Sequence, residues 1–115
     1  MPDKCMFCQI IAGKMPANII HRDEQVTAIR DINPQAPVHI LVMLNRHLTS
    51  VAHAQPSDEA LLGTLILAAS QIAEKEGLAA NGYRLVINTG SNGGQTAGHL
   101  HLHLLGGRRM TWPPG

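Results

Sequence analysis

The sequence predicts an α+β fold with a mostly antiparallel sheet. One long stretch, residues 57–77, has the apolar spacing of an amphipathic helix. Several short strand candidates lie on either side of it in the chain, joined by turns rather than by further long helices. Among them, residues 99–103 read His-Leu-His-Leu-His, the strict alternation of a half-buried strand. One long helix and several hairpin-linked strands are typical of α+β architecture.

The first half of the chain predicts one short helix and three strands. Residues 5–12 carry apolar side chains at helical spacing and are followed by a glycine, which is typical of a helix end. Residues 18–21 and 26–30 are strand candidates with a polar turn between them. The clearest early strand is 38–44, whose apolar row lies on one face and leaves His39 on the other.

The second half predicts the long helix and two more strands. Ser57 is a good N-cap, two acidic residues suit the first helical turn, and Gly77 ends the pattern. Residues 83–88 form another strand candidate. The glycine-rich segment 90–98 is expected to be a loop that leads into the strand at 99–103.

Composition limits the organisation and the partners. A length of 115 residues fits a single domain, residues 1–115, with one core. Because only 15% of residues are charged, we expect part of the surface to be covered in a homodimer. The net charge of +1 and the lack of a Lys/Arg run predict neither a nucleic-acid partner nor an anionic membrane surface.

No segment resembles a membrane span or a secretory signal. The apolar run at 61–69 is interrupted by Gly63 and Thr64 and is too short to cross a bilayer. The first residues, Met-Pro-Asp-Lys, do not begin an apolar signal segment. We therefore expect a cytoplasmic protein.

The three alternating histidines form the strongest candidate site. On a strand, His99, His101 and His103 share one face at a spacing of about 6.6–7 Å. Near neutral pH an imidazole can act as a base, a nucleophile, a hydrogen-bond donor or a metal ligand. The alternative is a purely structural row of polar residues. Three histidines at this period, backed by three leucines, disfavour it.

Cys5 and Cys8 form a C-x-x-C pair that leaves three interpretations open. A redox pair needs a βαβ context, which the sequence lacks. A disulfide is disfavoured in a reducing compartment. The third interpretation is half of a zinc site, which His47 and His99 could complete as a closed tetrahedron.

Three further features could serve a phosphate or a sugar. The loop Gly93-Gly94-Gln95-Thr96 could present backbone N–H groups to an anion, although it lacks the pattern of a Walker loop. His39 could orient a catalytic imidazole, or it could be a polar residue at the margin of a strand. Asp31 could be a turn residue or an acceptor for the hydroxyls of a sugar.

These residues together resemble the histidine-triad superfamily. The segment His99-Leu-His101-Leu-His103-Leu-Leu105 matches its His-φ-His-φ-His-φ-φ motif, where φ is hydrophobic. Residues 31–39, 93–95 and the closing Trp112-Pro-Pro-Gly also resemble the branch of histidine triad nucleotide-binding proteins. The resemblance extends from about Phe7 to the end of the chain.

The resemblance implies a fold and an activity. The fold would be a sheet of about five antiparallel strands with one long and one short helix, and two protomers would join into a continuous ten-stranded sheet. The ligands would be purine nucleoside monophosphates and phosphoramidates. The reaction would be hydrolysis of nucleoside 5′-phosphoramidates, with His101 as the nucleophile that forms a covalent nucleotidyl-histidine.

It also implies roles for the neighbouring residues. His103 and the N–H groups around Gln95 and Thr96 would hold the phosphate, and His39 would orient His101. Thr96 would help to protonate the departing amine, and Asp31 would bind the ribose. The remaining implied nucleotide contacts are Phe7, Ile29 and Ile32 at the base and Asn88 and Gly94 near the phosphate. We further expect Trp112 to reach the partner protomer and to tune the preference for the leaving group.

In many bacterial members of this branch, a cysteine pair binds zinc with the first triad histidine and a further histidine. The resemblance therefore implies a structural zinc at Cys5, Cys8, His47 and His99, and no catalytic metal.

Three other functions remain in view. The triad could hold a catalytic zinc, as three-histidine hydrolytic sites do. A nucleotide-holding dimer could regulate a partner, with turnover incidental. Hydrolysis of dinucleoside polyphosphates is a neighbouring activity within the superfamily.

Overall fold

The structure is a computed structural model that describes residues 4–115. The elements in chain order are α1 (Met6–Ile11), β1 (Ile19–Arg22), β2 (Val26–Arg30), β3 (Val38–Leu44), the 3-10 turns η2 (Val51–His53) and η3 (Pro56–Asp58), α2 (Glu59–Lys75), β4 (Tyr83–Ile87), α3 (Gly90–Gly93) and β5 (His101–Gly106).

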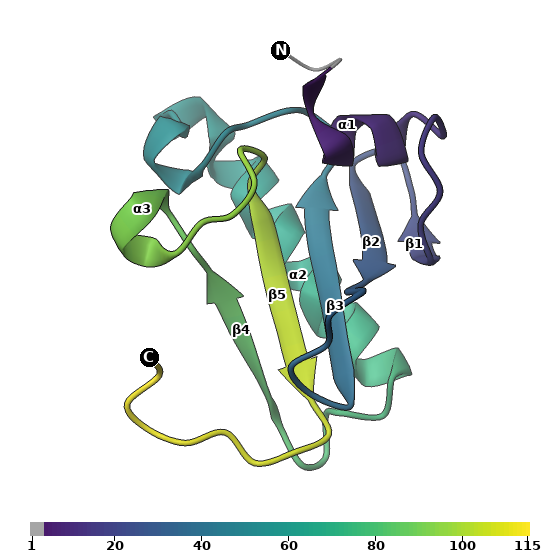
Figure 1. Cartoon of the computed structure of the whole chain (residues 1–115), viewed down its shortest axis with the longest axis vertical. Helices are drawn as coiled ribbons and strands as arrows, with labels where there is room; N and C mark the ends of the chain where they lie inside the picture. Colours follow the sequence, from purple (N-terminus) through teal and green to yellow (C-terminus); the bar gives the residue numbers. More distant parts are fainter. Residues whose placement is uncertain (1–3) are drawn as a thin grey trace.

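All five strands form one antiparallel sheet in the order β1-β2-β3-β5-β4 (Figure 1). β5, the last strand in the chain, therefore lies between β3 and β4. In this register His103 is opposite Leu41, and His101 is opposite Met43. The sequence-based prediction of an α+β fold with a five-stranded antiparallel sheet and one long helix is confirmed.

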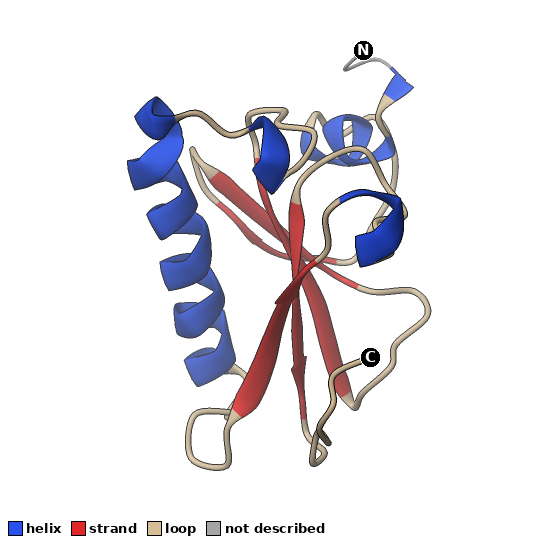
Figure 2. Ribbon diagram, turned by 90° about the vertical axis from the view of Figure 1, so that its left-hand side faces the viewer, coloured by secondary structure: helices blue, strands red, loops and turns tan. Residues whose placement is uncertain are grey.

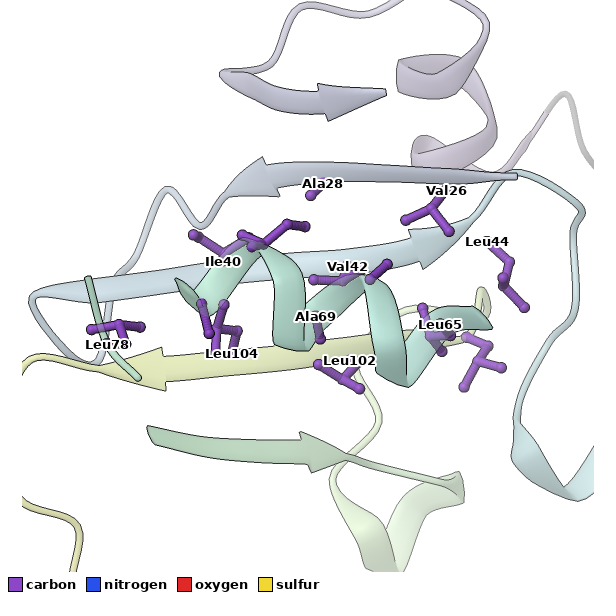
Figure 3. Close-up of a cluster of buried hydrophobic side chains, with 14 of the residues drawn as sticks. Val26, Ala28, Ile40, Val42, Leu44, Leu65, Ala69, Leu78, Leu102 and Leu104 are labelled. Atoms are coloured by element: carbon purple, nitrogen blue, oxygen red, sulfur yellow. The ribbon is translucent and has the colours of Figure 1, made fainter. Parts of the chain in front are cut away.

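α2 covers one face of the sheet (Figure 2). Alternate residues of β3 and β5, among them Ile40, Val42, Leu102 and Leu104, lie within 1% of complete burial under it. They pack against small and branched side chains of α2 such as Ala69 (Figure 3). Because strand residues alternate between faces, the same two strands direct their histidines to the opposite face.

A second, smaller apolar cluster lies on that opposite face. It joins α1 to the sheet through Phe7, Ile10, Ile29, Leu41 and Met43. Each of these side chains is less than 9% exposed. The histidine face is therefore bounded on one side by a docked helix rather than left open to solvent.

The start of the long helix differs from the prediction. Ser57 is not the N-cap, because Pro56–Asp58 forms a 3-10 turn and α2 begins at Glu59. The buried carboxylate of Asp58 accepts from the backbone N–H of Gln55 at 2.8 Å and from Arg46 at 2.7 Å. This pairing closes a tight turn before the helix. The predicted end is confirmed, since Gly77 follows the helix with a φ of +76°.

The start of β5 also differs. The strand begins at His101, because the backbone N–H of Leu100 donates to Leu48 in a loop and not to a neighbouring strand. His99 thus lies before the strand. The segment predicted as a plain loop contains the short helix α3, which ends at Gly94 with a φ of +77°. No helix within residues 4–115 is long and apolar enough to cross a membrane.

Candidate functional site

A cavity of about 400 Å³ opens on the histidine face, bounded by α1, the end of β2 and the start of β5. The predicted site residues that line it are Phe7, Ile29, Asp31, Ile32, Thr96, His101 and His103. Sequence reasoning missed most of its apolar wall, which is formed by Met6, Ile10, Met15, Pro16, Ala17, Leu41 and Ala97. In particular, Met15, Pro16 and Ala17 form a short run after α1, and such a run of small or apolar residues gives no sequence signal of ligand contact.

The backbone fixes the proton of His101. Its Nδ1 lies 2.8 Å from the carbonyl oxygen of His99, and a carbonyl can only accept. Nδ1 therefore carries the hydrogen, and Nε2 keeps a lone pair. The ring is 5% exposed and lines the cavity. Since an imidazole attacks through its unprotonated nitrogen, His101 presents a nucleophilic atom to the cavity.

A chain of hydrogen bonds gives His103 the opposite tautomer. The backbone N–H of Gln35 donates to Nδ1 of His39 at 3.0 Å, so the hydrogen of His39 is on Nε2. That Nε2–H donates to Nδ1 of His103 at 2.9 Å. The remaining nitrogen of His103, Nε2, therefore carries a hydrogen. Two neighbouring rings, with centroids 5.0 Å apart, thus offer a lone pair and a donor.

Burial keeps His103 and His39 neutral. Burial, together with the neighbouring His101 and His39, lowers the pKa of His103 to about 4, against the opposing effect of the Asp31 carboxylate. Burial also lowers the pKa of His39, and the carboxylate of Asp31 opposes that shift. At neutral pH both rings are uncharged, so the tautomers above are the functional forms.

The structure joins the ring of His39 to His103 rather than directly to His101, the ring that it was predicted to orient. His39 is opposite Leu105 in the sheet, and its ring bonds diagonally across the strands to His103, two residues before Leu105 on the same face. His101 is one step farther along β5 and receives its orientation from the backbone of His99. Asp31 stands behind His39, with its Oδ2 3.4 Å from Nε2 of His39. Its Oδ1 accepts from the backbone N–H of Asn33 at 2.8 Å.

The glycine-rich loop is held together by Gln95. The side-chain oxygen of Gln95 accepts from the backbone N–H of Gly90 at 3.0 Å, and its nitrogen donates to the carbonyls of Thr49 and Ala97 at 2.7 and 2.8 Å. The backbone N–H of Gln95 also donates to Gly90. The N–H of Gln95 is therefore used within the loop, which this residue shapes, and Thr96 lines the cavity. A phosphate contact from the N–H groups around Gln95 and Thr96 stays a prediction.

Other predicted contacts lie at the rim or away from the cavity. Ile32 lines the rim but is fully exposed, whereas Ile29 is 6% exposed. Asn88 follows β4 and Gly94 follows α3, and neither lines the cavity. Trp112 is 83% exposed on the C-terminal tail. The tail is tied to β4 by a hydrogen bond from Arg84 to the carbonyl of Thr111.

The four predicted metal ligands converge beside the cavity. One donor atom each from Cys5, Cys8, His47 and His99 lies within 4.8 Å of all the others. Nδ1 of His99 is 3.3 Å from the sulfur of Cys5 and 3.5 Å from that of Cys8. The sulfur of Cys8 is also 3.3 Å from Nδ1 of His47. In a tetrahedral zinc site, bonds of about 2.3 Å to sulfur and 2.0 Å to nitrogen place these donors about 3.5 Å apart. The donor set fits zinc.

The protonation of this cluster also suits a metal. Nε2 of His99 donates to the carbonyl of Leu44 at 2.9 Å, which leaves the lone pair on Nδ1 facing the sulfurs. Burial lowers the pKa of His99 and keeps the ring neutral. Burial, together with the neighbouring Cys5, raises the pKa of the Cys8 thiol to about 11. A metal would displace that proton.

The geometry disfavours a catalytic zinc held by the three triad histidines. His99 directs Nδ1 to the cysteine pair, whereas Nδ1 of His101 binds a carbonyl and Nδ1 of His103 binds His39. Within residues 4–115 the groups that could hold a metal are the Cys/His cluster and the set Asp31, His39 and His103. The second set is already joined by the hydrogen bond between the two imidazoles.

The fold and these paired imidazoles define a small α+β protein with a histidine-based site beside a cysteine–histidine cluster. The HIT domain family model matches residues 12–110, and the chain belongs to the HIT domain family.

Similar proteins of known sequence or structure support the same family assignment. The chain is 50% identical over 115 residues, the full length of both proteins, to an uncharacterized HIT-like protein of Synechococcus elongatus. It superposes with a TM-score of 0.96 on the crystal structure of a HIT family hydrolase from Legionella pneumophila, at 46% identity over 97% of this chain and 100% of that chain. A zinc-bound histidine triad family protein from Mycobacterium smegmatis matches with a TM-score of 0.77 and 29% identity over 94% of this chain and 78% of that chain. The protein is therefore similar to HIT family hydrolases.

Proposed function

We propose that this protein hydrolyses purine nucleoside 5′-phosphoramidates to the nucleotide and an amine through a covalent nucleotidyl group on His101. The observation that carries the proposal is the pair of opposite tautomers in one cavity. His101 offers a lone pair for attack on phosphorus, and His103 offers an N–H to a phosphoryl oxygen. Phosphoryl transfer needs mainly positioning and stabilised equatorial oxygens, which these two rings supply.

The reaction would proceed in two displacements. Nε2 of His101 forms a bond to phosphorus while the P–N bond breaks, and the departing nitrogen takes a proton that the Thr96 hydroxyl relays from solvent. Water then forms a P–O bond and loses a proton to solvent as the bond to His101 breaks. The nucleoside monophosphate leaves, and Nε2 regains its lone pair.

The rest of the cavity suits a nucleoside. Phe7 and Ile29 are at most 6% exposed and give an apolar wall for a purine base. The side chain of Asp31 is 18% exposed at the same cavity, where its carboxylate can accept from ribose hydroxyls. This division of polar and apolar walls is typical of small-molecule sites.

The proposal includes a structural zinc and a homodimer. Cys5, Cys8, His47 and His99 fit zinc, and one relative is described as zinc-bound. When bound, zinc would cross-link the N-terminal segment to the sheet, with no part in the chemical step. β4 is an edge strand whose residues are all half-exposed, so a second copy could pair there and extend the sheet to ten strands. Trp112, close to this edge in the chain's C-terminal tail, would then approach the partner protomer.

The test is direct trapping. The protein is mixed with an adenosine 5′-phosphoramidate, quenched within milliseconds and measured by intact mass spectrometry. We expect a nucleotidyl adduct on wild type and on His53→Ala, an exposed-histidine control, and none on His101→Ala. Nucleotide binding without an adduct or turnover would favour the regulatory module. Faster cleavage of dinucleoside polyphosphates would favour the neighbouring activity.

A further inference from the structure

Two residues link the Cys/His cluster to the nucleotide cavity. The first is His99, whose ring and backbone point to different sites. Its Nδ1 faces the sulfurs of Cys5 and Cys8 at 3.3 and 3.5 Å. Its carbonyl oxygen accepts the hydrogen bond that fixes the ring of His101. A change that moves the His99 ring toward or away from the sulfurs therefore acts on the backbone that orients the nucleophile.

The second linking residue is Phe7, which lies between the two cysteines in sequence. Its ring packs edge-on against His99 and His101, with centroid distances of 5.9 and 5.1 Å. It is 4% exposed and lines the nucleotide cavity. The side chain of Phe7 therefore contacts a predicted metal ligand and the proposed nucleophile, and it also lines the nucleotide cavity.

The helix that carries Phe7 depends on its docking. α1 has six residues, and an isolated helix of that length is not stable in water. It is held by its apolar cluster, by a hydrogen bond from Arg22 to the carbonyl of Ile10, and by the contacts of Cys5 and Cys8 with the two histidines. A metal at the cysteines would fix both ends of the first turn, and with it Met6 and Phe7 on the cavity wall.

From these contacts we infer that metal binding and nucleotide binding strengthen each other, with Phe7 and His99 as the positioning residues that couple them. This inference rests on the proposed nucleotide and zinc sites, but not on hydrolysis. Coupling between two binding sites is reciprocal, so each ligand must raise the affinity of the other by the same factor. A metal that only stabilises the fold would leave both factors at one in a protein that remains folded.

The experiment measures both directions of the coupling without an activity assay. Adenosine 5′-monophosphate is titrated calorimetrically into reduced, chelator-stripped protein and into zinc-loaded protein. Cobalt(II) is titrated by its thiolate absorption with and without saturating nucleotide, and circular dichroism checks that the stripped protein keeps its sheet. We expect each ligand to tighten the other by the same factor, about fivefold or more.

Two variants separate coupling from simple binding. Phe7→Ala should reduce the factor toward one. Ile32→Ala removes an apolar side chain from the rim of the same cavity, outside the cluster that docks α1, so it should weaken nucleotide binding equally with and without metal and leave the factor unchanged. If Phe7→Ala no longer binds metal, Phe7→Leu is measured instead, and a factor below that of wild type is expected.

A factor of one in wild type, or the full factor in the Phe7 variant, would overturn the inference, as would a lack of nucleotide or metal binding. The outcome is independent of the proposed reaction. Coupling factors above one without a His101 adduct would refute the hydrolase and keep the coupling. An adduct with no coupling would do the reverse.

Discussion

The two faces of the sheet are formed by the same strands but differ in the kind of side chain that they bury. Under α2, the two central strands present aliphatic side chains that are almost fully buried, among them Ile40, Val42, Leu102 and Leu104. On the opposite face the same strands bury imidazoles, and each of these has a hydrogen-bond partner on the backbone or on another imidazole. The first face supplies stability, and the second fixes tautomers. Substitutions on the two faces should therefore change different measured quantities.

The largest effect should come from removing the nucleophile. His101→Ala is expected to lower kcat/KM for an adenosine phosphoramidate by about a thousandfold or more, because the covalent route is lost. Nucleotide affinity should change far less, since Phe7, Ile29 and Asp31 remain. Steady-state kinetics with calorimetric binding checks this. Retained turnover would show that His101 is not the nucleophile.

The neighbouring residue on the other face should behave in the opposite way. Leu102→Ala is expected to lower the free energy of unfolding by about 2–5 kcal/mol, because it leaves a cavity beneath α2. Urea unfolding measures the loss. Among molecules that remain folded, kcat/KM should stay close to wild type. If Leu102→Ala were as inactive as His101→Ala but as stable as wild type, the two faces would not have separate roles in stability and activity.

Metal removal should act on the histidine face and on stability together. At free zinc one hundred times its dissociation constant, binding adds about 2.7 kcal/mol to the stability of a protein that binds only when folded. Thermal unfolding with zinc and with chelator measures this difference. Cys8→Ser should abolish the difference. A Tm that does not respond to zinc in wild type would argue against the cluster as a metal site.

The pH dependence of stability should report the buried rings. The pKa of His103 is lowered from its ordinary value of 6.5 to about 4 in the folded protein, so the unfolded chain binds more protons between these values. Stability should therefore fall as the pH decreases from about 6.5 toward 4. His103→Gln should flatten this part of the curve in urea unfolding. A stability that rises on acidification would contradict the burial of a neutral imidazole.

A smaller effect is expected in the glycine-rich loop. Gln95→Glu keeps the acceptor for Gly90 but loses both donations to backbone carbonyls, so Thr96 and Ala97 should be less well placed. We expect kcat/KM to fall about tenfold. Asn92→Ala, an exposed position in the same loop, is the matched control and should change little. Equal losses in both variants would show that the loop is not organised by Gln95.

The two faces also differ in how far sequence predicts them. Apolar alternation placed Ile40, Val42, Leu102 and Leu104 on one face, and the structure confirms the bounds 26–30 and 38–44. Such patterns depend on local periodicity, which the sequence contains.

The features of the site that local sequence patterns did not show depend on partners far away in the chain. The pairing of His39 with His103 follows from strand register, and the commitment of Gln95 to Thr49 follows from the packing of two distant loops. Local spacing also could not show that Leu100 bonds to Leu48, which excludes His99 from β5. Residue spacing alone offered His47 and His99 as metal ligands but left three interpretations of the cysteine pair open. The structure brings His47 to the cysteines.

The tautomers of His101 and His103 are the most direct test of this account. Long-range nitrogen–proton correlation spectra of the imidazole rings at pH 7, assigned with His101→Ala and His103→Gln, distinguish the two forms. The account predicts a hydrogen on Nδ1 of His101 and on Nε2 of His103. A hydrogen on Nε2 of His101 would leave no lone pair facing the cavity and would contradict the proposed nucleophile.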